Sequence, residues 1–188
     1  MIKLCLCFRD LFLASADELR GGEGNDALIG GNGDEMITVD NSIVGFTMEV
    51  DGNDGNDNVS ITSTLAGELD LFLGEGDNVA TLTLVRVADS ATVTGLSGKD
   101  TITANTMSVG TTLSIDTGDD TDTVSLTRTT ATEIDVDMGL GNLNRLSLTF
   151  CTADVGQFNC DGSIGNLIAL RSSRITAQTI TGFQIVTS

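Results

Sequence analysis

Glycine and acidic residues are regularly spaced in two consecutive nonapeptides near the start of the chain. Gly21–Ile29 reads GGEGNDALI and Gly30–Thr38 reads GGNGDEMIT, so both follow the pattern G-G-x-G-x-D/E-x-U-x, where U is a large apolar residue. Glycine adopts positive φ angles without steric cost, so such a turn can bring several carbonyl oxygens together. A neighbouring carboxylate adds another hard oxygen, and Ca²⁺ takes about six to eight such ligands. The spacing therefore predicts that stacked turns share calcium ions.

The repeat resembles that of the RTX (repeats-in-toxin) family, whose members form a calcium-binding parallel β-roll. The resemblance is close over residues 19–60 and looser over 74–147. It implies that calcium lies between adjacent turns, held by glycine-loop carbonyls and by the carboxylate at the sixth position. The metal ligands implied for this sequence are Gly22, Gly24, Asp26, Gly31, Gly33, Asp34, Glu35, Asp54, Asp57, Asp77, Asp100 and Asp122. Asn144, at the last turn, breaks the charge series.

Similar turns recur along the whole chain. Aligned on the acidic or amide residue, the series is Glu35, Asp57, Asp77, Asp100, Asp122 and Asn144, with separations of 22, 20, 23, 22 and 22 residues. Apolar and polar residues alternate just after each turn and again before the next, which is typical of strands with one buried face. The period predicts an all-β fold, a parallel β-solenoid (β-roll or β-helix) with about 22 residues and two short strands per turn.

The alternation also predicts which side chains face the core. After the turns we expect Val59, Ile61, Val79, Ile102, Val124, Leu126, Leu146 and Leu148 to point inward, and before the turns Met48, Val50, Leu69, Leu71, Ala91, Val93, Leu113, Ile115, Ile134 and Val136. Residues 1–18 are expected to form an N-terminal cap or edge strand, residues 19–148 the calcium-binding repeats, and residues 149–188 the C-terminal turns and cap. Segment 1–18 is too short and too charged to span a membrane.

The amino-acid composition argues against several classes of function. The net charge is −18, and the chain has no His, Trp, Tyr or Pro. This charge repels nucleic acid and anionic membranes and attracts cations. Without His the usual general base is missing, so a non-catalytic protein is expected. A polysaccharide-active solenoid enzyme is the catalytic alternative, but Lys99, Arg128 and Arg145 are too scattered to form a uronate site.

Several features have two interpretations. Gly-x-Asp turns are common without metal, because Asp and Asn side chains hydrogen-bond to backbone N–H groups. Outward acids such as Glu49, Asp70 and Asp135 are either a second ion column or a solvated face. The outward Ser and Thr residues suit an ordinary strand surface, or a regular array that binds ice or a partner surface.

The four cysteines are equally open to interpretation. Cys151 and Cys160 bracket an eight-residue loop that a disulfide could close in an oxidising compartment. Cys5 and Cys7 share one face of the expected N-terminal strand, where two buried or incidental thiols are a simpler interpretation than a zinc site.

The leading hypothesis is a non-catalytic, calcium-stabilised module of a secreted or surface bacterial protein. The RTX resemblance implies export in an unfolded state and folding on contact with extracellular calcium. The alternative is a structural subunit that assembles end to end into a filament, sheath or surface layer, because solenoid ends are strand edges.

Overall fold

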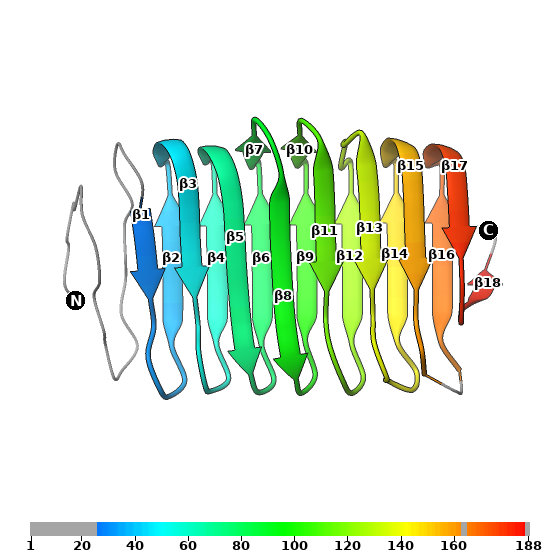
Figure 1. Cartoon of the computed structure of the whole chain (residues 1–188), viewed down its shortest axis with the longest axis horizontal. Coiled ribbons are helices and arrows are strands. Elements are labelled where there is room, and N and C mark those ends of the chain that lie inside the picture. Colours follow the sequence, from blue (N-terminus) through cyan, green and yellow to red (C-terminus); the bar gives the residue numbers. More distant parts are fainter. Residues whose placement is uncertain (1–25, 163–164, 187–188) are drawn as a thin grey trace.

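A computed structural model describes residues 26–162 and 165–186 of the chain, and every regular element in these ranges is a strand. The strands form two parallel sheets that lie face to face, and the chain passes from one to the other in each turn (Figure 1). The fold is therefore the parallel β-solenoid that the sequence predicts. The segment expected to cap the N-terminal end, 1–18, lies outside the described residues. The described residues contain no helix long and apolar enough to cross a membrane.

The front sheet, nearest the viewer in Figure 1, has its strands in the order β1-β3-β5-β8-β11-β13-β15-β17. Two short strands, β7 and β10, extend it along one margin. The bounds are β1 (Asp26–Ile29), β3 (Ile43–Asp51), β5 (Leu65–Glu75), β7 (Arg86–Val87), β8 (Ala91–Ser97), β10 (Ser108–Val109), β11 (Thr112–Asp116), β13 (Glu133–Asp137), β15 (Thr152–Asn159) and β17 (Arg174–Ile180).

The back sheet has the order β2-β4-β6-β9-β12-β14-β16-β18. Its strands are β2 (Met36–Asp40), β4 (Asn58–Thr62), β6 (Val79–Thr83), β9 (Thr101–Asn105), β12 (Thr123–Thr127), β14 (Arg145–Thr149), β16 (Leu167–Arg171) and β18 (Gln184–Val186). Equivalent residues of successive turns stand opposite one another: Val124 pairs with Ile102 on one side and with Leu146 on the other. The parallel pairing continues without a break past residue 148, through β16 and β18.

The core is one narrow apolar column between the sheets. All but one of the expected inward side chains are buried, and the exception is Val79, which is 40% exposed. Ala80 and Leu82 take the inward positions of β6 instead, in register with Val59 and Ile61 of β4. The coil that ends in β6 is one residue shorter than its neighbours, because β3 has one residue more than β5 at the register shift between Val44 and Thr47. A shift of one residue moves a side chain to the opposite face of a strand.

The two edges of the solenoid turn in different ways. At the glycine edge, loops such as 52–57 and 117–122 lead from the front sheet to the back sheet. At the tight edge, each return passes through one residue with φ between 49° and 57°; these residues are Asn41, Ser63, Leu84, Thr106, Arg128, Phe150 and Ser172. Most of them carry bulky or branched side chains, which rarely adopt this conformation. The tight corners are therefore imposed by the stacking of the coils.

A disulfide between Cys151 and Cys160 is ruled out by their positions. Cys151 lies at the tight edge and Cys160 at the glycine edge, and both are buried free thiols at opposite ends of extended β15. An eight-residue strand is about 25 Å long. The Cα atoms of disulfide-bonded cysteines are at most about 7 Å apart. The segment between the two cysteines is a strand, not the loop that the sequence suggested.

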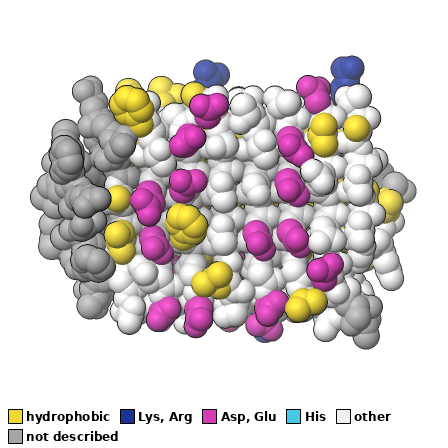
Figure 2. Space-filling model, viewed as in Figure 1, with side chains coloured by type: hydrophobic (Ala, Val, Ile, Leu, Met, Phe, Trp, Pro, Cys, Tyr) yellow, Lys and Arg dark blue, Asp and Glu magenta, His cyan; other side chains and the backbone are white. Residues whose placement is uncertain are grey.

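The two outer faces differ in chemistry. The front face carries most of the outward carboxylates, on β3, β5, β11 and β13. The back face carries mainly Ser and Thr, and from β4 to β12 its strands contain no charged residue. Figure 2 shows the front face, where the carboxylates form two groups and the Lys and Arg side chains lie only near the margins.

Candidate functional site

A column of buried Asp and Asn side chains follows the glycine edge inside the solenoid. Each side-chain Oδ1 accepts a hydrogen bond from the backbone N–H of the equivalent residue one turn earlier, at 2.7 to 3.1 Å. We call this column the inner ladder; its side chains belong to Asp57, Asn78, Asp100, Asp122, Asn144 and Asn166, and Glu35 begins it by donating its backbone N–H to Asp57. All seven residues are at most 3% exposed. The ladder satisfies backbone N–H groups that the turns would otherwise leave without a partner in the interior.

Amide and carboxylate members differ in their second side-chain atom. The Nδ2 of Asn78 donates to the Gly76 carbonyl at 3.0 Å, and the Nδ2 of Asn144 donates to the Met138 carbonyl at 2.8 Å. Asp122 Oδ2 accepts from the Thr117 hydroxyl at 2.7 Å. The Oδ2 of Asp100 is buried without a hydrogen-bond partner. An unsatisfied buried oxygen of this kind costs stability.

The buried carboxyl groups of the inner ladder have raised pKa values. Burial raises the pKa of Asp100 to about 7; the Asn78 backbone N–H opposes this shift, and the charge of Asp122 adds to it. Burial likewise raises the pKa of Asp122 to about 6, against the stabilising hydrogen bonds from the Asp100 N–H and the Thr117 hydroxyl. Burial also raises the pKa of Asp57. Asp100 therefore keeps its proton to a much higher pH than an ordinary carboxyl group.

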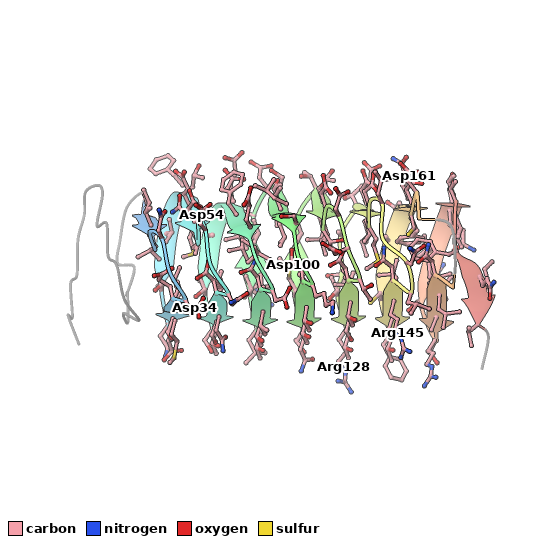
Figure 3. The ribbon with its side chains drawn as sticks, turned by 90° about the horizontal axis from the view of Figure 1, so that it is seen from below. Asp34, Asp54, Asp100, Arg128, Arg145 and Asp161 are labelled. Carbon is pink, nitrogen blue, oxygen red and sulfur yellow. The ribbon has the colours of Figure 1, made fainter. Side chains whose placement is uncertain are left out.

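This arrangement does not suit calcium ligation by the inner ladder. The Oδ1 atoms of Asp57, Asp100 and Asp122 are already used by backbone N–H groups, and their side chains are enclosed by the turns. Asp57 Oδ2 lies against Gly52, and Asp100 Oδ2 lies against Gly95, so closely that no side-chain carbon would fit on either glycine. Figure 3 shows Asp100 between the two layers, whereas Asp54 and Asp161 project on one outer side and Arg145 on the other.

The prediction that Asp77 belongs to the same series as Asp57 and Asp100 is wrong. Asn78 holds that position, and Asp77 is exposed in a second column. In this outer ladder Asp34 Oδ1 accepts from the Asn56 N–H, and Asp77 Oδ1 accepts from the Lys99 N–H, each at 2.8 Å. Here each side chain bonds to the following turn, whereas in the inner ladder it bonds to the preceding one.

The glycines of the repeat have a packing role. Gly33, Gly55, Gly76 and Gly98 stack on one another with φ angles of 138°, 143°, 113° and 108°. A Cβ atom on Gly55 would overlap the Gly33 carbonyl group, and one on Gly76 would overlap the Gly55 carbonyl. Close contact between coils therefore accounts for the spacing of these glycines without a metal.

The first nonapeptide is only partly described. Gly22 and Gly24 lie outside the described residues, and Asp26 begins β1. In the second nonapeptide, Gly31 has φ 111°, Glu35 is buried in the inner ladder, and Asp34 is exposed in the outer ladder.

Open carboxylates gather in a shallow groove at the glycine edge. Asp51, Asp54 and Glu75 line it together with Asn53 and Phe72. Asp54 and Glu75 are paired in a parallel bridge between successive turns. Asp51 Oδ1 accepts from the Asn53 N–H at 3.1 Å and so supports the turn. We call this feature the acidic groove; of the predicted metal ligands it contains Asp54.

A second group of acids covers β11 and β13 on the front face. Asp116 stands directly opposite Asp137 in the register, and Glu133 and Asp135 project from the same strand as Asp137. Partial burial raises the pKa of Asp135, and the negative charges of Glu133, Asp137 and Asp116 raise it further. The outward acids thus repel one another, as expected for carboxylates on adjacent strands about 4.8 Å apart.

No group of three or more Asp, Glu or Cys side chains within residues 26–162 and 165–186 is arranged to hold a metal ion. The acidic groove brings three carboxylates together beside backbone turns, and a cation there would have to draw its ligands together.

Comparison with known protein-family models, with curated proteins and with solved structures finds no match to this chain.

Proposed function

We propose that this chain is a non-catalytic β-solenoid module, stabilised by calcium outside the cell, and that the acidic groove is its principal ion site. The observation that supports this proposal is the set of carboxylates from Asp51, Asp54 and Glu75 around one groove. Calcium accepts carboxylates, backbone carbonyls and water in a flexible shell, so exposed side chains can rotate towards it. The inner ladder has no part in this site.

The charge distribution supports the same proposal. A chain with a net charge of −18 is destabilised by its own repulsion when it becomes compact. The nearest charges acting on Asp135 are all carboxylates, so the front face lacks internal compensation there. A divalent cation that binds the folded state reduces this repulsion, and its binding free energy adds to the free energy of folding.

Calcium should therefore raise the melting temperature of the protein. At a calcium concentration of about 100 times Kd, a single site adds about 2.7 kcal/mol, or roughly 5 to 10 °C for a domain of this size. Circular dichroism melting curves with chelator, with calcium and with magnesium provide the measurement. An identical melting temperature in chelator and in calcium would contradict the proposal.

The site can be located by a paired substitution. Asp54→Asn with Glu75→Gln should weaken calcium binding about tenfold, because two carboxylates are lost from the acidic groove. Glu133→Gln with Asp135→Asn removes the same charge from β13 and serves as the matched control. Isothermal titration calorimetry of both variants distinguishes a groove site from a general effect of charge. Equal weakening in the two variants would place the ion elsewhere.

End-to-end assembly is a second candidate function, supported by the C-terminal end of the stack. β17 and β18 are the terminal strands of the two sheets among the described residues, and Ile185 and Val186 are 57% and 42% exposed. Strand edges with exposed apolar residues readily pair with another chain.

Assembly through this end should depend on its apolar residues. Sedimentation velocity at rising protein concentration should show growing oligomers, and Ile185→Lys should suppress them by placing a charge at the strand edge. Phe46→Lys, at a side chain that is 71% exposed and lies on β3 away from this end, is the control. A monomer at all concentrations would exclude the assembly.

A further inference from the structure

The outer face of the back sheet is a regular array of hydroxyl groups. Three outward positions recur on β4, β6, β9 and β12, and they fall into columns because the strands are parallel and in register. Nine of these twelve positions carry a hydroxyl group, and the other three are Asn58, Val79 and Asn105. We call the array the hydroxyl face; its members are Ser60, Thr62, Thr81, Thr83, Thr101, Thr103, Thr123, Ser125 and Thr127. The central column continues to Thr38 on β2 and to Ser147 on β14, in the same register.

The array repeats in two directions. Equivalent hydroxyls of adjacent strands are about 4.8 Å apart, and outward residues two apart along one strand are about 6.7 Å apart. The central column from Thr38 to Ser147 is therefore about 24 Å long. The first repeat is slightly longer, and the second slightly shorter, than the oxygen repeats on the faces of hexagonal ice parallel to its long axis, so an ordered water layer would have to take up the difference.

The side chains of the array are held in place. Thr103 has inward neighbours Ile102 and Ala104, which are 0% and 2% exposed, so the backbone beneath the array is anchored in the core. Threonine is branched at Cβ and has restricted χ1 rotamers, so its methyl and hydroxyl groups keep fixed positions. A rigid array of this kind can order water molecules between its columns at little entropic cost.

The absence of charge sets this face apart from the rest of the molecule. The four strands β4, β6, β9 and β12 contain no Asp, Glu, Lys or Arg, although the whole chain has 27 acidic and 9 basic residues. A charged group binds its own hydration shell strongly and resists transfer into an ordered lattice. An uncharged face opposite an acidic face favours a neutral partner with a regular surface.

We propose that the hydroxyl face binds ice, with ordered water between its columns as the contact layer. A crystalline polysaccharide is the other regular, neutral surface, but the chain has neither Trp nor Tyr, whose rings combine an apolar face with a polar group. This proposal does not require calcium to bind to the hydroxyl face, because β4, β6, β9 and β12 contain no carboxylate.

The test uses the full chain in calcium-containing buffer and measures inhibition of ice recrystallisation and partition into a growing ice front. The folded protein should inhibit recrystallisation and enter the ice. Thr103→Lys, at the centre of the array, should weaken inhibition about tenfold or more, because the ammonium group must be dehydrated at the contact. Thr92→Lys, on β8 of the front face, makes the same chemical change outside the array and should leave inhibition unchanged.

Circular dichroism shows that both variants are folded, and Thr103→Val separates two contributions. Valine keeps the branched shape and removes the hydroxyl, so a moderate loss is expected if the hydroxyl contributes to the ordered layer. The proposal is overturned if the folded protein neither inhibits recrystallisation nor enters ice, or if Thr92→Lys and Thr103→Lys lose activity equally. Binding to crystalline chitin or cellulose without binding to ice would also overturn it. A dimer in sedimentation velocity that Thr103→Lys dissociates and Thr92→Lys does not would overturn it as well.

Discussion

Lowering the pH from 8 to 5 in calcium-free buffer should stabilise the folded protein, by on the order of 4 kcal/mol in the free energy of unfolding. The cause is burial of the inner-ladder carboxyls, which raises the pKa of Asp100 to about 7 and that of Asp122 to about 6. Most proteins lose stability over part of this range, because their native carboxylates have lowered pKa values.

The direction follows from proton binding in the two states. In the unfolded chain both groups ionise near the ordinary value of 3.8. Between pH 3.8 and their raised pKa values, the folded state holds protons that the unfolded state has lost. Stability from these groups is therefore complete below about pH 3.8, and it is lost as the pH rises through about 6 for Asp122 and about 7 for Asp100.

Thermal unfolding at pH 5, 6, 7 and 8 provides the measurement. The melting temperature should be roughly 10 °C higher at pH 5 than at pH 8, given about 2 to 4 °C per kcal/mol for a domain of this length. The combined Asp100→Asn and Asp122→Asn variant is the control, and its pH profile should be much flatter. A wild-type melting temperature that is constant or lower at pH 5 would show that these carboxyls are not buried as described.

The repeat and the core were readable from the sequence because each depends on local patterns. Alternation of apolar and polar residues is forced by the geometry of a strand, so Val59, Ile61, Val124 and Leu126 could be assigned to the core directly. Two alternating segments in each period predicted two strands per turn. The buried face of each strand needs a neighbouring turn on either side, so the turns were expected to stack. The assignment failed only for Val79, because the register shift between β3 and β5 shortens that coil by one residue.

The candidate site was less predictable because Gly and Asp have two uses in a turn. The spacing around Asp57 and Asp100 fits a calcium loop, yet it also fits inter-coil packing of glycine and hydrogen bonding by a buried side chain. One signal was available: with Asn78 in place of Asp77 the separations become 22, 21, 22, 22 and 22, a more regular series. Both Asp and Asn occupy this position in the column. Because the two side chains share an Oδ1 acceptor, the position requires an acceptor oxygen more than it requires a charge.

Exchanging amide and carboxyl within the inner ladder should change stability in opposite directions. Asn144→Asp should lower the free energy of unfolding at pH 8 by about 3 kcal/mol, because the new Oδ2 would face the Met138 carbonyl that Asn144 Nδ2 now contacts at 2.8 Å. At pH 5 the loss should shrink, since a protonated carboxyl can donate to that carbonyl in place of the amide.

Asp100→Asn is the reciprocal change and should raise stability at pH 8 by roughly 1 to 3 kcal/mol. An amide cannot ionise, its Oδ1 keeps the hydrogen bond from the Asn78 N–H, and its Nδ2 can reach a turn carbonyl as Asn78 reaches Gly76. Both variants are measured by chemical denaturation in calcium-free buffer and by calcium titration. If Asp100→Asn instead weakened calcium binding and lowered stability, Asp100 would be a metal ligand. If its stability rises with calcium affinity unchanged, the buried carboxyl serves only the ladder, and the ion site must be formed by the open acids of the surface.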